Sequence, residues 1–381
     1  MTDSLTALAG RLVANGIRFR YLRAAGNVSK PWAVSLEVTH RCIAKCLMCN
    51  IWQIPRDTPF LSADQWLQLL SRDLFTDLVE LDITGGEPFL RKDLADLLIA
   101  VCQHKETHLP ALKSIAVTTN GILTEPVLKG TKKVLIEAQH KDTDLVVVCA
   151  MDAVGELHDT VRGYSGGWIR LNRTIQGLIR LREKFPNLIV GLKSTILPMT
   201  VGHLDAIVRY AKKYGLFTIV SPCIITQGRY LNDDRAEALS FDRQQIDEMT
   251  RFFRKKATQW SFHDQCLVSY FESGRMKKPC TCGFNYFFIR SQGDLMPCPM
   301  IDASLGNVIE EPIETLLASE KGRRIRRRIG RFPECSHCTE PGLERYSLPF
   351  EGWTYLSLLP RMGKRRFEHM HVHLGLDKYF M

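Results

Sequence analysis

Residues 37 to 52 read Glu-Val-Thr-His-Arg-Cys-Ile-Ala-Lys-Cys-Leu-Met-Cys-Asn-Ile-Trp, which places Cys42, Cys46 and Cys49 in a C-x3-C-x2-C spacing directly after a strand-like run. The count of three cysteines, rather than four, is informative. A 4Fe-4S cluster contains four irons, so a chain that supplies three thiolates leaves one iron open for another ligand. Zinc is the alternative for these cysteines, although zinc sites normally close with four ligands.

A second motif follows the next strand-like run. Thr84-Gly85-Gly86-Glu87-Pro88 comes directly after the apolar run from Leu78 to Ile83. Glycines let a backbone come close to a bound molecule, and a carboxylate or a carbonyl accepts hydrogen bonds from an ammonium group. Together, the two motifs resemble the radical S-adenosylmethionine (radical SAM) superfamily, in which the open iron of the three-cysteine cluster binds SAM.

The composition predicts a globular, cytoplasmic protein. The chain has 381 residues, of which 45% are hydrophobic, so it can bury a sizeable core in one large domain and a smaller one. No apolar run reaches the roughly 20 residues that span a bilayer, and the first residues lack the order of a signal peptide. Twelve cysteines in such a chain indicate metal ligands and buried thiols rather than disulfides.

The formal charge of +10 points to an acidic partner. Nucleic acid is one candidate, but the basic residues lack the interleaved aromatic pattern of RNA-binding proteins, which argues against it. A flavodoxin or ferredoxin-type reductant is the partner that we expect, because a reductively activated cluster needs an electron donor and such donors are acidic.

Six apolar runs alternate with helical stretches from Trp32 onward, and this order predicts parallel strands joined by crossover helices. The runs are 33–38, 78–84, 114–119, 145–151, 188–197 and 217–225. Six is also the number of strands in the partial (β/α)6 barrel of radical SAM proteins. We therefore expect an α/β fold whose site lies at the C-terminal ends of the strands.

The resemblance implies further contacts to SAM. Met48 stands where the family often places an aromatic residue against adenine. Thr119 and Asn120 resemble the family's third-strand turn, although an ordinary Asn-Gly turn is an equal alternative. Lys193, in the fifth predicted strand, resembles a position that meets substrate in a GTP-rearranging relative. The full set of expected SAM contacts is Met48, Gly85, Gly86, Glu87, Pro88, Thr119, Asn120, Asp152, Arg162 and Ser194.

Two of these contacts depend on a stretch that departs from the family pattern. Ala150 replaces the serine that touches the SAM ribose in the family, so Asp152 becomes the expected hydroxyl acceptor. Arg162 closes a stretch that resembles the family's H-D-x-x-R-G sequence, in which the arginine pairs with the SAM carboxylate. A plain surface arginine is the alternative for Arg162.

More cysteines follow near the C-terminal end. A predicted hairpin, with strands at 287–289 and 295–296 and the turn Ser-Gln-Gly-Asp, brings Cys280 close to Cys298, and a C-x2-C pair follows. The pattern resembles the auxiliary-cluster domain called SPASM, in its shortened "twitch" form, and implies a second 4Fe-4S cluster. The expected ligands are Cys280, Cys298, Cys335 and Cys338, with Cys282 as the alternative to Cys280. A zinc ribbon is the structural alternative.

These features divide the chain into five segments. We expect an amphipathic helical arm at 1–32, the partial barrel at 33–230, a helical connector at 231–275, a small α+β twitch/SPASM-like domain of hairpin and helix at 276–345, and a basic, aromatic tail at 346–381. The arm has apolar residues at helical spacing. It therefore either packs on the following domain or makes peripheral contact with a membrane surface.

The resemblance implies an enzyme that reductively cleaves SAM to a 5′-deoxyadenosyl radical, which removes a hydrogen atom from substrate, while the auxiliary cluster transfers electrons. A small-molecule or lipid-biosynthetic substrate is favoured, because the arm at 1–32 is too short for a leader-peptide-binding domain. The first alternative is a maturase that crosslinks or oxidises a ribosomally made peptide or protein. The second is a non-catalytic iron–sulfur or zinc protein that binds RNA.

Overall fold

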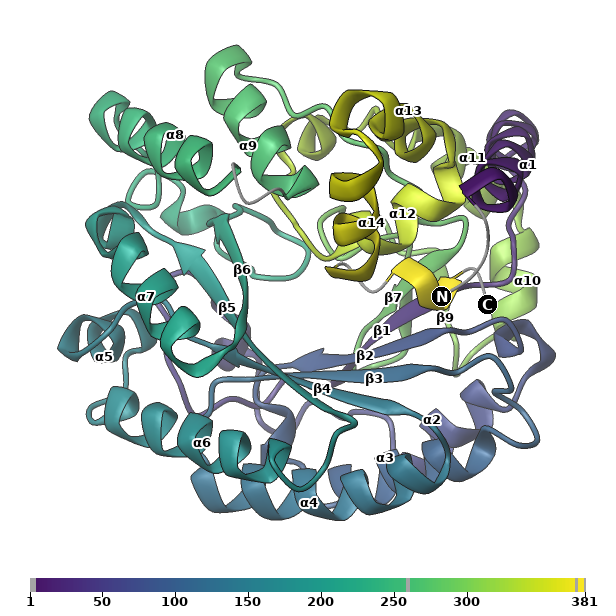
Figure 1. Cartoon of the computed structure of the whole chain (residues 1–381). Coiled ribbons are helices and arrows are strands. Elements are labelled where there is room, and N and C mark those ends of the chain that lie inside the picture. The colour runs from purple at the N-terminus through teal and green to yellow at the C-terminus, as the bar shows by residue number, and fades with distance from the viewer. Residues whose placement is uncertain (1–4, 258–260, 374–375, 380–381) are drawn as a thin grey trace.

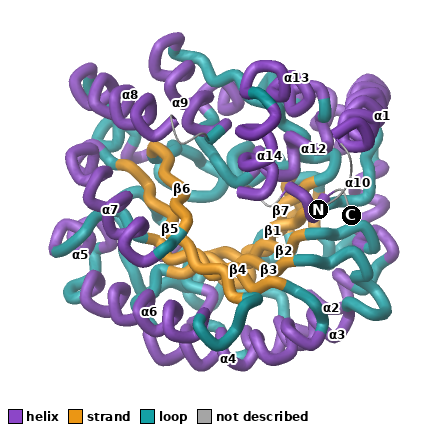
Figure 2. Tube along the Cα trace, in the orientation of Figure 1, coloured by secondary structure: helices purple, strands orange, loops and turns teal. Residues whose placement is uncertain are grey.

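Six parallel strands form the centre of the computed structural model, which describes residues 5–257, 261–373 and 376–379. They lie close to the six predicted apolar runs. The strands are β1 (Ala33–Thr39), β2 (Glu80–Gly85), β3 (Ser114–Thr119), β4 (Asp144–Ala150), β5 (Leu188–Ile196) and β6 (Phe217–Pro222). The predicted partial barrel is confirmed: the strands curve into an open arc rather than a closed ring (Figure 2).

The helices that join the strands cover the outer face of the arc (Figure 1). They are α2 (Ala63–Leu70), α3 (Leu94–His104), α4 (Thr124–His140), α5 (Glu156–Arg162), α6 (Gly167–Arg182) and α7 (Leu204–Tyr214). Strand residues such as Val34, Leu81 and Ile115 share one buried cluster with helix residues such as Trp66 and Leu97. All seven residues of β1 are buried, as expected for a parallel strand covered on both faces.

The sheet continues into the C-terminal region. Strand β7 (Tyr286–Ile289) pairs in parallel with β1, and β8 (Asp294–Met296) and the short β9 (Gly306–Asn307) extend the sheet beyond it. The predicted hairpin is present, because β7 and β8 are antiparallel and Gly293 turns the chain with a φ of 99°. The pairing of β7 with β1 makes barrel and hairpin parts of one nine-stranded sheet.

The remaining regular structure of the described residues is mostly helical. The expected helical connector contains α8 (Arg243–Ala257) and α9 (Phe262–Ser273), which pack against each other. Beyond the hairpin lie α10 (Ile313–Ala318) and α11 (Glu320–Arg328). The segment expected to be a tail instead folds into α12 (Leu343–Glu351), α13 (Trp353–Met362) and α14 (Lys364–His373). Tyr355 and Phe367 from this segment are buried, which explains its aromatic composition.

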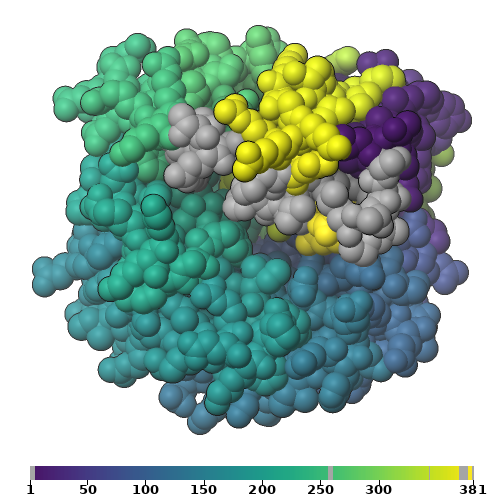
Figure 3. Space-filling view, viewed as in Figure 1, coloured from purple at the N-terminus to yellow at the C-terminus, as the bar shows by residue number. Residues whose placement is uncertain are grey.

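The N-terminal helix α1 (Leu5–Ala25) packs on these C-terminal helices rather than on the barrel. Its face of Leu8, Leu12, Phe19 and Leu22 is buried, and Figure 3 shows the purple N-terminal region beside the yellow C-terminal region. A Cβ on Gly16 would lie 2.3 Å from the Trp353 ring, so the two helices meet closely. The apolar face that suggests membrane contact is therefore covered by protein. In the described part of the chain, no helix has the length and apolar character needed to cross a membrane.

Candidate active site

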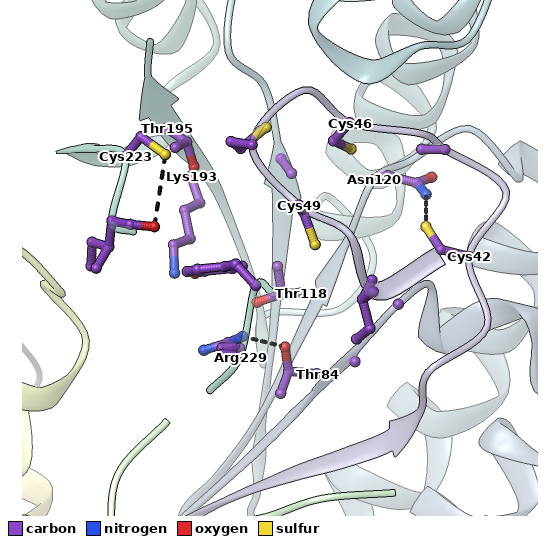
Figure 4. Close-up of a pocket in the computed structure, with 18 of the residues that line it drawn as sticks. Cys42, Cys46, Cys49, Thr84, Thr118, Asn120, Lys193, Thr195, Cys223 and Arg229 are labelled. Carbon is purple, nitrogen blue, oxygen red and sulfur yellow. Dashed lines mark hydrogen bonds between the residues drawn. The ribbon is translucent and has the colours of Figure 1, made fainter. Parts of the chain in front are cut away.

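A cavity with about 1000 Å³ of empty space lies at the C-terminal ends of the strands, beneath the three-cysteine loop (Figure 4). The strand ends are the expected place for a site in a parallel barrel. Loop residues 42–52 contribute one side of the wall, and the ends of β2 to β6 contribute the opposite side. The polar and charged lining residues are Cys42, Cys46, Cys49, Thr84, Thr118, Thr119, Asn120, Arg162, Lys193, Thr195, Ser221, Cys223, Arg229, Tyr230 and Glu340.

The end of β2 holds the start of the cysteine loop. Gly86 N–H donates to the Thr39 carbonyl at 2.8 Å, and Glu87 N–H donates to the Arg41 carbonyl at 2.9 Å. A Cβ on Gly85 would lie 2.1 Å from the Thr39 oxygen, and one on Gly86 would lie 2.2 Å from the Arg41 oxygen. The two glycines are therefore needed for the backbone to approach the loop, in addition to lining the cavity.

The three thiols of the loop are partly or fully buried. Burial, together with the charge of Cys46, raises the pKa of Cys42 and of Cys49 to about 12. Two donors face the sulfurs: Asn120 Nδ2 lies 3.9 Å from Cys42 Sγ, and Arg162 Nη1 lies 3.6 Å from Cys46 Sγ. The loop could therefore hold an iron–sulfur cluster, whose iron must displace the thiol protons.

Six of the ten predicted SAM contacts line this cavity: Met48, Gly85, Gly86, Thr119, Asn120 and Arg162. The predicted substrate residue Lys193 also lines it. The other four predicted SAM contacts, Glu87, Pro88, Asp152 and Ser194, are not lining residues, and all four are buried. These four residues do not line the cavity because they pack against, or bond to, other parts of the protein.

Glu87 faces the protein rather than the cavity. Its carboxylate accepts from Thr119 Oγ1 at 2.8 Å, from Asn120 N–H at 2.8 Å and from Phe89 N–H at 3.1 Å. Burial raises the pKa of Glu87 to about 7, although these hydrogen bonds act in the opposite direction. Glu87 therefore ties the end of β2 to the end of β3, and Pro88 is buried in the turn that follows.

Asp152 and Ser194 also have partners within the protein. Asp152 forms an ion pair with Arg162 Nη2 at 2.7 Å and accepts a hydrogen bond from Thr195 N–H at 2.9 Å. Ser194 Oγ donates to the Met151 carbonyl. Asp152 therefore orients Arg162, which does face the cavity and is 9% exposed at its side chain rather than a surface arginine.

Sequence reasoning missed Arg229, Tyr230 and Glu340. Arg229 and Tyr230 lie in the loop after β6, and Glu340 follows the last cysteine of the C-terminal pair. Glu340 forms an ion pair with Lys193 at 3.4 Å. None of the three lies in a periodic run or a family motif, so only the folded chain brings them to the cavity.

The cysteines of the C-terminal region surround a second cavity of about 1120 Å³ of empty space. All five candidates, Cys280, Cys282, Cys298, Cys335 and Cys338, line it. A hydrogen bond from Cys282 lowers the pKa of Cys280 to about 7. Five thiols around one cavity could hold a closed four-ligand cluster, and the choice between Cys280 and Cys282 stays open.

A groove borders both cavities. It has about 1550 Å³ of empty space and shares Pro222, Cys223 and Ile224 with the first cavity. It shares Met300 and Glu334 with the second cavity. Apolar side chains such as Phe241 and Phe271 line its middle. The groove therefore borders both the cavity beneath the three-cysteine loop and the cavity of the C-terminal cysteines.

Comparisons with known proteins agree with this arrangement. The model of the radical SAM superfamily matches residues 36–211, and the model of an iron–sulfur cluster-binding domain, SPASM, matches residues 280–339. The first match covers the barrel and the three-cysteine loop, and the second covers the hairpin and the C-terminal cysteine pair.

Two curated relatives come from Bacillus subtilis (strain 168). The antilisterial bacteriocin subtilosin biosynthesis protein AlbA is 21% identical over 354 residues, which cover 90% of this chain and 70% of AlbA. The sporulation killing factor maturation protein SkfB is 21% identical over 303 residues, which cover 78% of this chain and 67% of SkfB. The match to AlbA thus extends through both cysteine regions.

The fold is shared with a solved structure, that of Streptococcus suis SuiB bound to S-adenosylmethionine. The TM-score is 0.58 at 17% identity, and the match covers 81% of this chain and 70% of SuiB. The predicted cofactors, 4Fe-4S clusters and SAM, are confirmed at the level of the two domains. The chain is a member of the radical SAM superfamily of enzymes and carries an iron–sulfur cluster-binding SPASM domain near its C-terminal end.

Proposed function

We propose that this enzyme is a maturase that crosslinks or oxidises a ribosomally made peptide. The observation that carries the proposal is the similarity to AlbA over 90% of the chain, because AlbA is described as a bacteriocin biosynthesis protein. SkfB, described as a maturation protein, supports it. These relatives favour the peptide alternative over the small-molecule or lipid-biosynthetic substrate.

The lining of the groove also supports a peptide. The groove adjoins the first cavity and is lined by apolar and aromatic side chains. An extended peptide fits such a space, with one residue in the cavity and its neighbours along the groove.

We propose Cys42, Cys46 and Cys49 as ligands of the cluster that binds SAM, and Cys298, Cys335, Cys338 and either Cys280 or Cys282 as ligands of the auxiliary cluster. When bound, the first cluster and SAM supply a 5′-deoxyadenosyl radical that removes a hydrogen atom from substrate. The protein supplies Arg162, held by Asp152, beside Cys46, and a buried cavity that limits the access of water.

We also propose an acidic flavodoxin or ferredoxin as the electron donor, in the cytoplasm. A surface groove with about 2130 Å³ of empty space has Cys280 among its lining residues. We call it the basic groove, because it is lined by Arg20, Arg23, Lys277, Lys278, Arg361 and Arg366, against the single carboxylate of Glu351. An acidic donor in the basic groove would lie beside the auxiliary site, and charge attraction would speed its association.

Incubation with a candidate precursor tests the maturase proposal. The reconstituted enzyme, SAM and a reductant are combined anaerobically with the peptide encoded next to its gene, and the peptide mass is measured. We expect a mass lower by two hydrogen atoms, with 5′-deoxyadenosine formed in proportion. Deuterium on the reacting carbon should appear in the 5′-deoxyadenosine. An unchanged peptide together with turnover of a small metabolite would contradict the proposal.

A further inference from the structure

We propose that Arg229, with Lys193 beside it, forms a subsite that binds the side-chain carboxylate of an Asp or Glu residue in the peptide substrate. The inference rests on the proposed maturase function and deepens it, because it names a chemical feature of the substrate. The observation that carries it is an arginine that lines the cavity and has no carboxylate partner in the described part of the chain.

Arg229 is held in place by neutral groups. Its Nη2 donates to Thr84 Oγ1 at 2.7 Å. Its guanidinium lies over the Tyr230 ring at 5.4 Å and over the Phe288 ring at 5.6 Å, as distances to the centroids. These contacts orient the side chain, and among the described residues most of its five N–H donors have no protein acceptor.

The charges of the cavity wall do not balance. Four charged side chains line the cavity: Arg162, Lys193, Arg229 and Glu340. Arg162 is paired with Asp152 at 2.7 Å, and Lys193 is paired with Glu340 at 3.4 Å. Among the described residues, this leaves the Arg229 guanidinium without an ion pair. An uncompensated cation in a confined space is costly, and an anionic ligand removes that cost.

The charge of Arg229 also acts on two other carboxyl groups, which do not form ion pairs with it. Glu37 is buried against Ser291, which donates to it at 2.9 Å, and Asp82 accepts from Ser35 Oγ at 2.7 Å. Burial raises the pKa of both carboxyl groups, despite the opposing charge of Arg229. Among the carboxyl groups, the charge of Arg229 interacts most strongly with Glu340, which also interacts with Lys193 and Lys278.

The neighbouring cation strengthens the subsite. Figure 4 shows Lys193 and Arg229 on the same side of the pocket, away from Cys42 and Cys46. The Lys193 side chain is 22% exposed, and its 3.4 Å contact to Glu340 is longer than a tight ion pair. Arg229 can bind a carboxylate through two parallel N–H bonds, while Lys193 adds a point charge. A carboxylate held there places the adjoining carbon atoms in the cavity under the cysteine loop.

The test compares two blocked tripeptides that differ only in one charge, acetyl-Gly-Glu-Gly-amide and acetyl-Gly-Gln-Gly-amide. Their dissociation constants are measured by anaerobic calorimetry on the reconstituted, SAM-loaded full-length enzyme. We expect the Glu tripeptide to bind about tenfold more tightly, as for one charge-assisted hydrogen bond. Arg229→Gln should abolish the preference, Arg229→Lys should restore part of it, and the exposed Arg243→Gln should leave it intact.

The other outcomes separate the possible sources of the carboxylate. Equal binding of the two tripeptides by the native enzyme would overturn the subsite while leaving the maturase proposal standing. A persistent preference in Arg229→Gln, with SAM affinity reduced about tenfold, would assign Arg229 to the SAM carboxylate and overturn the proposal. Glutarate binding that depends on Arg229, without tripeptide binding, would keep a carboxylate subsite but contradict a peptide substrate.

Discussion

At the residue scale, the cysteines of the chain divide into groups with different surroundings. Cys42, Cys46 and Cys49 lie on one loop over the strand ends, and five others surround the second cavity. Cys102 is buried in the core between the sheet and the outer helices, away from both cavities. Substitutions in the three groups should therefore have distinct effects.

We predict that Cys46→Ala abolishes SAM cleavage, because the cluster loses one of its three protein ligands. Cys335→Ala should leave some cleavage of SAM but no modified peptide, because the auxiliary cluster then fails while the first site remains. Release of 5′-deoxyadenosine and peptide mass are measured on the same samples. Cys102→Ala is the matched control and should retain both activities. Equal loss in Cys46→Ala and Cys335→Ala would mean that the second site is needed for folding.

Some residues of the candidate site could be predicted from the sequence, and others could not. The cysteines and the glycines could be predicted because their spacing is set by short-range chemistry. Arg229 and Glu340 could not, because a single charged residue in a loop carries no periodic signal. Glu87 lies in a predicted motif, but its hydrogen bonds to Thr119 and Asn120 appear only when β2 and β3 pair.

At the element scale, the six strands could be predicted from apolar runs, because most residues of β1 to β5 are buried, as is the second half of β6. The pairing of β7 with β1 could not be predicted, since it joins segments from opposite ends of the chain. The N-terminal helix could be predicted from the spacing of its apolar residues, but the helices that it packs against could not. They are the C-terminal helices, which the sequence suggests to be a tail.

The turn after β2 leads to a prediction about cluster assembly. Gly86→Ala should displace the start of the cysteine loop, because the added Cβ would lie 2.2 Å from the Arg41 carbonyl oxygen. Overpacking of this kind costs about 1–3 kcal/mol. We expect less iron after reconstitution and a lower melting temperature. Gly202→Ala is the control, because its nearest neighbour would lie 4.0 Å away. Normal iron content in Gly86→Ala would contradict this role of the turn.

The start of β2 leads to a prediction about acid stability. Glu80 is 1% exposed and forms ion pairs with Arg345 and, at 2.7 Å, with Lys378. Burial alone would raise the pKa of Glu80, but the two cations outweigh it and lower the pKa from 4.5 to about 2. The carboxylate therefore stabilises the fold above pH 4.5, and this contribution is lost as the pH falls toward 2.

Glu80→Gln should accordingly lower the free energy of unfolding at neutral pH by about 3 kcal/mol, because it leaves two cations without their partner. Its stability should also change less with pH between about 4.5 and 2 than that of the native protein. Denaturant melts across this range measure both effects. The exposed Glu125→Gln is the control. A variant with the same acid dependence as the native protein would exclude Glu80 as the cause.

At the scale of the whole molecule, one sheet links two cysteine-lined cavities, and a groove shares lining residues with both of them. The basic groove lies on the outside of the second cavity. Under the proposed function, this arrangement would separate the entry of electrons from the entry of a peptide, so that both proposed partners could be bound at once. The net charge predicts an acidic partner, but only the fold gathers the basic residues next to Cys280.

The basic groove leads to a prediction about the electron donor. Arg361→Glu combined with Arg366→Glu should weaken the binding of oxidised flavodoxin by about tenfold at low salt, because attraction becomes repulsion. The difference should shrink as salt screens the charges. Lys132→Glu combined with Lys133→Glu, on the exposed face of α4, is the control of equal charge. Equal weakening by both pairs would show that net charge alone, rather than the basic groove, attracts the donor.

The cleavage of SAM by the native protein tests the central claim most directly. The full chain is reconstituted anaerobically with iron and sulfide, mixed with SAM and dithionite, and assayed for 5′-deoxyadenosine and bound metal. We predict release of 5′-deoxyadenosine and iron sufficient for two 4Fe-4S clusters. A folded protein that binds zinc in both cysteine-lined cavities and releases no 5′-deoxyadenosine would contradict the account.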